Sequence, residues 1–205
     1  MEETPFTLRF KLGSIPVEIQ PWFWLMAAVL GGNMLGPRIL IWILVVFVSV
    51  LVHELGHALA ALAFGARARI LLYSFGGLTY PSRRFSKWKD IAMTLAGPGA
   101  GFLLAALVFG VTRLNPPLTD VGWWTVARII EVNVAWGILN LLPVPPLDGG
   151  HVAMSLVGPR HERKALYFGA ALAALIAVYF LTHGSLYTVI LFGMLAFQNF
   201  QKARG

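Results

Sequence analysis

A long apolar stretch of this chain contains two histidines and a glutamate, in the sequence His53-Glu54-Leu55-Gly56-His57. The stretch extends from Ile39 to Phe64, which is long enough to cross the hydrocarbon core of a membrane as one helix. Residues four apart share one face of a helix, so His53 and His57 can bind the same metal ion while Glu54 stands beside it. The pattern therefore predicts a metal site within a membrane-spanning helix.

The residue types indicate which metal this site would hold. Imidazole nitrogens combined with one carboxylate oxygen, and an open fourth position, form the ligand set of catalytic zinc. The chain has no cysteine, so thiolate ligands are excluded. A buried histidine pair can instead be a hydrogen-bonded core contact, but ionisable residues inside a membrane are costly and usually functional. One zinc ion bound by this helix is the favoured interpretation.

The composition is that of a polytopic membrane protein. Of 205 residues, 58% are hydrophobic and only 12% are charged, and the mean hydropathy is +0.72. We expect one membrane-embedded domain over residues 1–205, with its catalytic core in residues 39–151. Residues 1–20 lack a basic segment followed by an apolar core, so no cleavable signal is expected. The net charge of +7 requires no nucleic-acid partner, because basic cytoplasmic loops that face anionic lipid account for it.

Apolar runs predict an all-α membrane protein with six transmembrane helices. They cover residues 21–36, 39–65, 90–113, 122–142, 165–183 and 186–200, and the first and last are short for a span. Thirteen of the 16 Lys and Arg residues fall on the cytoplasmic side if the N-terminus is cytoplasmic. Both termini are therefore expected in the cytoplasm, with the metal site about one third of the way into the bilayer from that side.

A third metal ligand must come from the few acidic residues. Glu131 lies three residues after Arg128, so an ion pair near the outer interface explains it best. Asp148 is the better candidate, because it follows residues 140–147, whose three prolines end a helix at membrane depth, and precedes Gly149-Gly150. Irregular backbone at that depth is tolerated where it lines a cavity or is buried in protein.

Two further residues have predicted roles beside the metal. Glu54 is suited to take a proton from the attacking water as a general base and to return it to the leaving amine as a general acid. Asn140 can point its amide into the same cavity and stabilise an oxyanion. An asparagine in a membrane helix can equally be an interhelical hydrogen-bonding residue, and that alternative stays open.

Two segments alternate polar and apolar residues and predict short β-hairpins on the cytoplasmic side. The first comprises Thr7–Leu12 and Ile15–Ile19, and the second comprises Arg69–Phe75, a turn at Gly76-Gly77 and Leu78–Tyr80. An exposed edge of such a hairpin could bind an unwound substrate as an additional strand. Alternatively, the strands only pack against the cytoplasmic ends of the helices.

The two main motifs, His53-Glu-Leu-Gly-His57 and Asn140-Leu-Leu-Pro-Val-Pro-Pro-Leu-Asp148-Gly-Gly, resemble those of the site-2 protease family of intramembrane zinc metalloproteases. The resemblance extends to Ala96-Gly97-Pro98 and Gly76-Gly77. It implies proteolysis of single-span membrane proteins within the bilayer, often in regulated signalling with membrane partners. It also implies that His53, His57 and Asp148 bind zinc, that Glu54 is catalytic, and that Asn140 contacts the oxyanion or the substrate.

No PDZ-like insert follows the metal-binding helix, so the resemblance is to the minimal archaeal and sporulation-type branch of the family. Two other functions remain as alternatives, a catalytically silent metal-binding scaffold and a divalent-metal transporter. A scaffold has no need of Glu54. The polar residues of the predicted spans are too scattered to form a transport path: Asn33, Ser49, Thr94 and Asn133. The two last predicted spans carry none of the proposed ligands, which suggests them as the mobile gate for a substrate.

Overall fold

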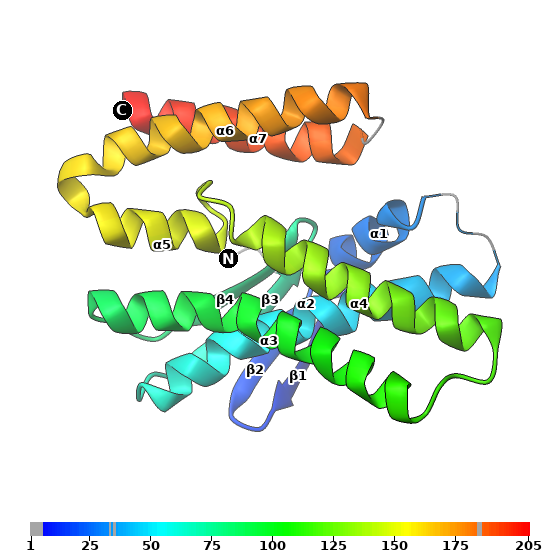
Figure 1. Cartoon of the computed structure of the whole chain (residues 1–205). Coiled ribbons are helices and arrows are strands. Elements are labelled where there is room, and N and C mark those ends of the chain that lie inside the picture. The colour runs from blue at the N-terminus through cyan, green and yellow to red at the C-terminus, as the bar shows by residue number, and fades with distance from the viewer. Residues whose placement is uncertain (1–5, 33, 35, 184–185) are drawn as a thin grey trace. The chain divides into compact units, whose positions relative to one another are not determined.

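A computed structural model describes residues 6–32, 34, 36–183 and 186–205, and Figure 1 shows its course. The chain is mostly helical, with one small sheet. Its elements are β1 (Leu8–Leu12), β2 (Ile15–Ile19), α1 (Pro21–Leu30), α2 (Pro37–Ala63), β3 (Ala68–Tyr73), β4 (Gly76–Pro81), α3 (Lys87–Leu114), α4 (Asp120–Asn140), α5 (Asp148–Val157), η1 (Pro159–His161), α6 (Glu162–Thr182) and α7 (Leu186–Arg204).

The elements form two compact units, which are described separately. The first unit contains residues 1–85 and 96–137, and the second contains residues 86–95 and 138–205. The expectation of one domain over residues 1–205 stays a prediction.

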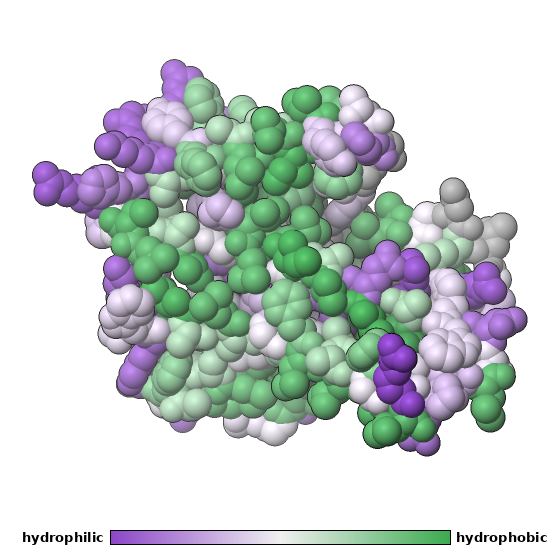
Figure 2. Space-filling model, in the orientation of Figure 1, coloured by the Kyte–Doolittle hydropathy of each residue, from purple (hydrophilic) through white to green (hydrophobic). Residues whose placement is uncertain are grey.

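Three helical segments are long and apolar enough to cross a membrane, among the residues described: Pro37–Ala63, Lys87–Leu114 and Pro159–Thr182. Figure 2 shows hydrophobic residues over much of the face of the molecule in view. Exposed leucines on these segments include Leu40, Leu44, Leu103, Leu107 and Leu175. Large exposed apolar areas of this kind require a non-aqueous environment or a partner. The protein is therefore an integral membrane protein.

The prediction of six spans is not confirmed. The first predicted span, 21–36, contains α1 of only ten residues, and residues 33 and 35 lie outside the described residues. Ten helical residues extend about 15 Å, half the thickness of the hydrocarbon core. Helices α4 and α7 occupy the places of predicted spans, but they are not among the described helices apolar enough to qualify.

Both predicted hairpins are present, but they join into one sheet. The strand order is β1-β2-β3-β4, and the parallel pairing of β2 with β3 was not predicted. The second turn lies at residues 74–75, because β4 already begins at Gly76, so the predicted Gly76-Gly77 turn is wrong. Within the described sheet, β3 is internal, and β1 and β4 are the edge strands. The placement of the hairpins on the cytoplasmic side stays a prediction.

In the first unit, α2 packs closely against α3 and α4. A Cβ atom added at Gly56 on α2 would overlap the Ala96 carbonyl and the Ala100 side chain on α3. Helices α2 and α3 therefore approach each other almost backbone to backbone. On α4, the buried Asn133 donates a hydrogen bond to Ser49 Oγ on α2 at 2.8 Å. Small residues and one buried polar contact thus fix the helix that carries the two histidines.

In the second unit, α6 and α7 pack side by side and hold the Pro-rich segment 141–147 (Figure 1). The chain leaves α4 after Asn140 because three prolines in this segment disfavour a helix. Val144 is fully buried in one apolar cluster with Ala173 and Ala177 of α6 and with Phe192 and Leu195 of α7. The segment is therefore a packed part of the second unit.

Candidate metal centre

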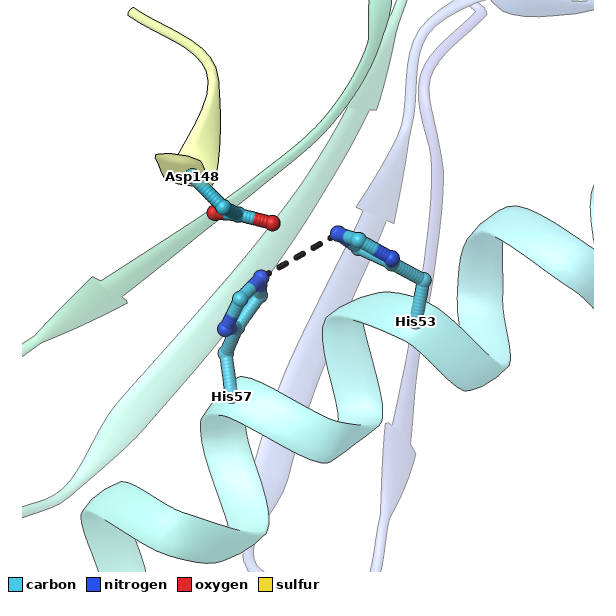
Figure 3. Close-up of side chains that lie close together, drawn as sticks. All are labelled: His53, His57 and Asp148. Carbon is cyan, nitrogen blue, oxygen red and sulfur yellow. Dashed lines mark hydrogen bonds between the residues drawn. The ribbon is translucent and has the colours of Figure 1, made fainter. Parts of the chain in front are cut away.

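The two histidines lie on one face of α2, as their spacing predicts. Both are buried, at 4% and 7% exposure, and their Nε2 atoms are 3.2 Å apart (Figure 3). Two nitrogens bound at 2.0–2.1 Å to one tetrahedral zinc ion would be about 3.3 Å apart. The distance between the two nitrogens therefore fits two adjacent ligand positions of a zinc ion.

Gly97 on α3 makes room for His57. A Cβ atom at Gly97 would overlap the His57 ring around its Nε2 atom, whereas one at Gly99 would have no atom within 4 Å. The sequence analysis noted Gly97 only as part of the Ala96-Gly97-Pro98 resemblance and missed its specific role beside His57. Two glycines separated by one residue are equivalent in the sequence, and only the packed helices distinguish them.

Glu54 is buried beside the histidines and is held by β4. The Thr79 hydroxyl lies 2.8 Å from Glu54 Oε2 and 3.1 Å from the Glu54 main-chain carbonyl oxygen, so it can donate its proton to either. A Cβ atom at Gly77 would overlap the Glu54 carboxylate, so this close approach requires glycine. Sequence analysis missed Thr79 and the contact of Gly77 with Glu54, because both residues lie twenty or more positions after the motif and no local pattern connects them to it.

Tyr73, at the end of β3, is a second hydroxyl near this carboxylate. Burial raises the pKa of its hydroxyl, and the neighbouring Tyr80 and Glu54 raise the pKa further. Because the shift is upward from a value of 10.0, Tyr73 remains a protonated hydroxyl at neutral pH. It can therefore serve there as a neutral hydrogen-bond donor.

We expect a Thr79→Val substitution to weaken the positioning of Glu54. The substitution preserves the shape of the side chain and removes the hydrogen bond to a charged carboxylate, a contact worth about 1.5–3 kcal/mol. Turnover should fall about 10- to 100-fold with zinc content unchanged. The measurement is the cleavage rate beside zinc content, with Thr79→Ser as the control that keeps the hydroxyl. Equal rates for the Val and Ser variants would contradict this role.

Asp148 and Asn140 lie in the second unit, at opposite ends of the Pro-rich segment. Asn140 is the last residue of α4, and Asp148 is the first residue of α5. Gly149 and Gly150 are buried, and Cβ atoms there would overlap the backbone at Leu141 and Pro145. Neither glycine has a positive φ, so the close approach of the backbone, and not an unusual conformation, requires glycine at both positions.

One candidate metal-binding group occurs in the part of the chain that the structure describes. It consists of His53, His57 and Asp148, drawn together in Figure 3. Glu131, the rejected alternative ligand, instead forms an ion pair with Arg128 at 2.6 Å, as predicted. Two imidazoles and one carboxylate are the donor set of a catalytic zinc site.

Comparisons with known proteins relate the chain to zinc metalloproteases. The model of peptidase family M50 matches residues 41–119 and 117–183. The chain is 38% identical over 120 residues to a putative zinc metalloprotease of Synechocystis. The matched region covers 58% of this chain and 31% of that protein. It is 26% identical over 179 residues to a zinc metalloprotease of Methanocaldococcus jannaschii, with 83% and 52% covered. Stage IV sporulation protein FB of Bacillus subtilis is 28% identical over 147 residues, with 69% and 48% covered.

The fold is similar to that of a solved structure, the site-2 protease from Methanocaldococcus jannaschii. The TM-score is 0.69 at 23% sequence identity, with 98% of this chain and 96% of that chain covered. By contrast, the chain spans only 31% to 52% of the length of the three relatives above. The predicted resemblance to the site-2 protease family is confirmed. Because the family model matches more than half of its residues, this chain belongs to peptidase family M50.

Proposed function

We propose that this protein is an intramembrane zinc metalloprotease that hydrolyses peptide bonds within or near transmembrane segments of membrane proteins. One observation carries the proposal: two buried imidazole nitrogens stand 3.2 Å apart, next to a buried glutamate, on a helix long and apolar enough to cross a membrane. Ionisable groups at such a depth are retained at a cost and indicate function.

In this proposal His53, His57 and Asp148 hold one zinc ion. A zinc ion supplies a Lewis acid that activates water and polarises the scissile carbonyl group. The Glu54 carboxylate takes a proton from the attacking water and returns it to the leaving amine. Thr79 orients that carboxylate through the hydrogen bond described above. The Asn140 amide donates to the oxyanion that forms on the scissile carbonyl.

The assignment of Asp148 is tested most directly by zinc content. Asp148→Ala should lower zinc affinity by more than the about 10- to 100-fold typical of residues that only support a ligand. Elemental analysis and chelator competition on the detergent-purified protein measure it. Glu131→Gln is the control, because it removes a carboxylate that pairs with Arg128 and should leave zinc bound. Unchanged zinc content in Asp148→Ala would overturn the assignment.

The substrates in this proposal are single-span membrane proteins whose cleavage is regulated. A substrate helix must unwind before its carbonyl groups can reach the metal, because they are engaged in hydrogen bonds to residues four positions later. Strand β4 is suited to bind the unwound segment, since it is an edge of the described sheet and already contacts Glu54 through Thr79. The alternative, that the sheet only packs against helix ends, predicts no ordered binding of the substrate backbone.

The sequence suggests a proline at Leu72 or Ser74 as a test of this idea, but Ser74 lies in the turn after β3, and Leu72 lies in the internal strand β3 and is fully buried. A proline there would disrupt the sheet and would not test its edge. A proline scan of the substrate is the sharper test. Because alternate amides of an added strand bond to the edge, proline should reduce cleavage at every second substrate position. A uniform response along the scan would argue against strand addition.

The proposed orientation places both termini in the cytoplasm and the metal site about one third of the way into the bilayer from that side. It is supported by the distribution of Lys and Arg residues. Because the chain has no cysteine, one cysteine introduced at either terminus can be tested with a membrane-impermeant thiol reagent. If the reagent labels either cysteine from outside intact cells, that terminus is outside the cytoplasm and the proposed orientation is wrong.

A further inference from the structure

Asn199 on α7 is a buried polar residue that contacts the Pro-rich segment. Its side chain is 1% exposed, and its Nδ2 donates to the Pro145 carbonyl oxygen and, at 2.8 Å, to the Leu195 carbonyl oxygen one turn earlier on α7. Its Oδ1 is buried without a hydrogen-bond partner among the described atoms. An unpaired buried oxygen is costly, and the hydrogen bond that Asn199 donates to the Pro145 carbonyl oxygen offsets part of that cost.

The backbone at Pro145 is in turn pressed against the start of α5. A Cβ atom at Gly150 would overlap the Pro145 nitrogen and the neighbouring Val144 carbonyl carbon. Gly150 is two residues after Asp148 in the first turn of the same helix. A displacement of Pro145 must therefore move the first turn of α5, because close-packed backbone has no free space to absorb the movement.

The helix pair α6–α7 holds the same segment at two other points. Val144 is fully buried between the pair, and a Cβ atom at Gly169 on α6 would lie 3.0 Å from Pro145 Cδ. These contacts are apolar and not directional, whereas the hydrogen bond from Asn199 fixes both the position and the rotation of the Pro145 carbonyl. Asn199 is thus the one directional contact described between α7 and this segment.

We propose that Asn199 is a positioning residue for Asp148, acting from α7 through the Pro145 carbonyl and the Gly150 contact. This rests on the proposed function, in which Asp148 binds zinc. Helix α7 then stabilises the metal site although it contributes no ligand. Movement of α7 away from the segment, as a substrate gate requires, would lower the affinity for zinc.

Two substitutions test the proposal on the full-length protein in detergent. Asn199→Leu removes both donated hydrogen bonds at similar volume. Asn199→Thr is milder, because a threonine hydroxyl can keep the bond to the carbonyl of residue 195 while losing reach to Pro145. Arg163→Met is the matched control, since Arg163 Nε donates to the Ala203 carbonyl oxygen at 2.6 Å and so joins α6 to α7 without touching the segment.

The readouts are zinc affinity by chelator competition, the visible absorption bands of the Co²⁺-substituted protein, and the melting temperature. Both Asn199 variants should bind zinc about 10- to 100-fold more weakly, with altered Co²⁺ bands. Arg163→Met should lower the melting temperature while zinc affinity and Co²⁺ bands stay as in the wild type.

Unchanged zinc affinity and Co²⁺ bands in Asn199→Thr would overturn the positioning role. A loss of zinc affinity in Arg163→Met equal to that in the Asn199 variants would also overturn it, because it would indicate general loosening of the helix pair. Either result, with zinc still bound by the wild type, leaves the proposed function intact. A wild-type protein that binds no zinc would overturn the proposed function and this inference together.

Discussion

Replacement of Glu54 by glutamine should leave zinc bound and reduce peptide-bond cleavage by about 10²- to 10⁴-fold, the usual contribution of a general acid–base residue. Glutamine keeps the size of the side chain, and its carbonyl oxygen can still accept the hydrogen bond from Thr79. It cannot take a proton from water, which is the step that the proposal assigns to Glu54. Zinc content and cleavage of a transmembrane substrate, measured on the same preparation, check this result.

The same variant separates the proposed enzyme from its alternatives. A metal-binding scaffold would keep its function without the Glu54 carboxylate, and a divalent-metal transporter would show a change in metal flux. Loss of zinc together with loss of cleavage would instead mean that Glu54 supports the metal site and has no separate role in proton transfer. Cleavage at the wild-type rate would exclude Glu54 as the general base.

Replacement of Gly97 by alanine should disturb the metal site directly, through the ring of His57. The added Cβ would overlap the His57 ring, so the ring must rotate or α3 must move away from α2. Overpacking of this kind costs about 1–3 kcal/mol, which corresponds to a loss of zinc affinity of about 10- to 100-fold when it displaces a ligand.

Gly99→Ala is the control for this prediction, because the same change two residues later on α3 meets no atom within 4 Å. Alanine favours a helix over glycine, so this variant should be at least as stable as the wild type and should bind zinc normally. Chelator competition and melting temperature on the two variants give the comparison. Equal zinc affinity for both would show that His57 does not need the space beside Gly97.

Local patterns predicted most of what lies close together in the sequence. The facing of His53 and His57 follows from their spacing of four, and the strands of both hairpins follow from alternation of polar and apolar residues. The ion pair between Arg128 and Glu131 likewise follows from a spacing of three. In each case one periodicity determines the contact.

Contacts between distant segments could not be read from the sequence. The parallel pairing of β2 with β3 joins residues more than fifty positions apart, and the hydrogen bond from Thr79 to Glu54 joins two different elements. No periodicity encodes such pairings, because they depend on how whole elements pack. For the same reason, the internal position of β3 is known only from the folded chain. Because Leu72 lies in this internal strand, it cannot be used to test the edge of the sheet.

The prediction of six spans stays unconfirmed for a related reason. Apolar runs report hydrophobicity, and they do not report where a helix ends. Helix α1 ends at Leu30, followed by Gly31 as its C-cap, so the apolar run beginning at Pro21 yields a helix too short to cross a bilayer alone. Sequence hydropathy therefore identified the apolar composition of this region but not the residue at which its helix ends.

The close contact of Gly56 with Ala96 and Ala100 has a consequence for protein design. The fourth letter of the His-Glu-Leu-Gly-His sequence carries no chemistry of its own, yet no larger side chain can occupy it while α3 lies where it does. If this five-residue sequence is transferred to another membrane helix, a second helix with alanines opposite the glycine must therefore be transferred with it. The transferable part is a pair of helices, and a copy of the five residues alone would arrive without the partner that shapes it.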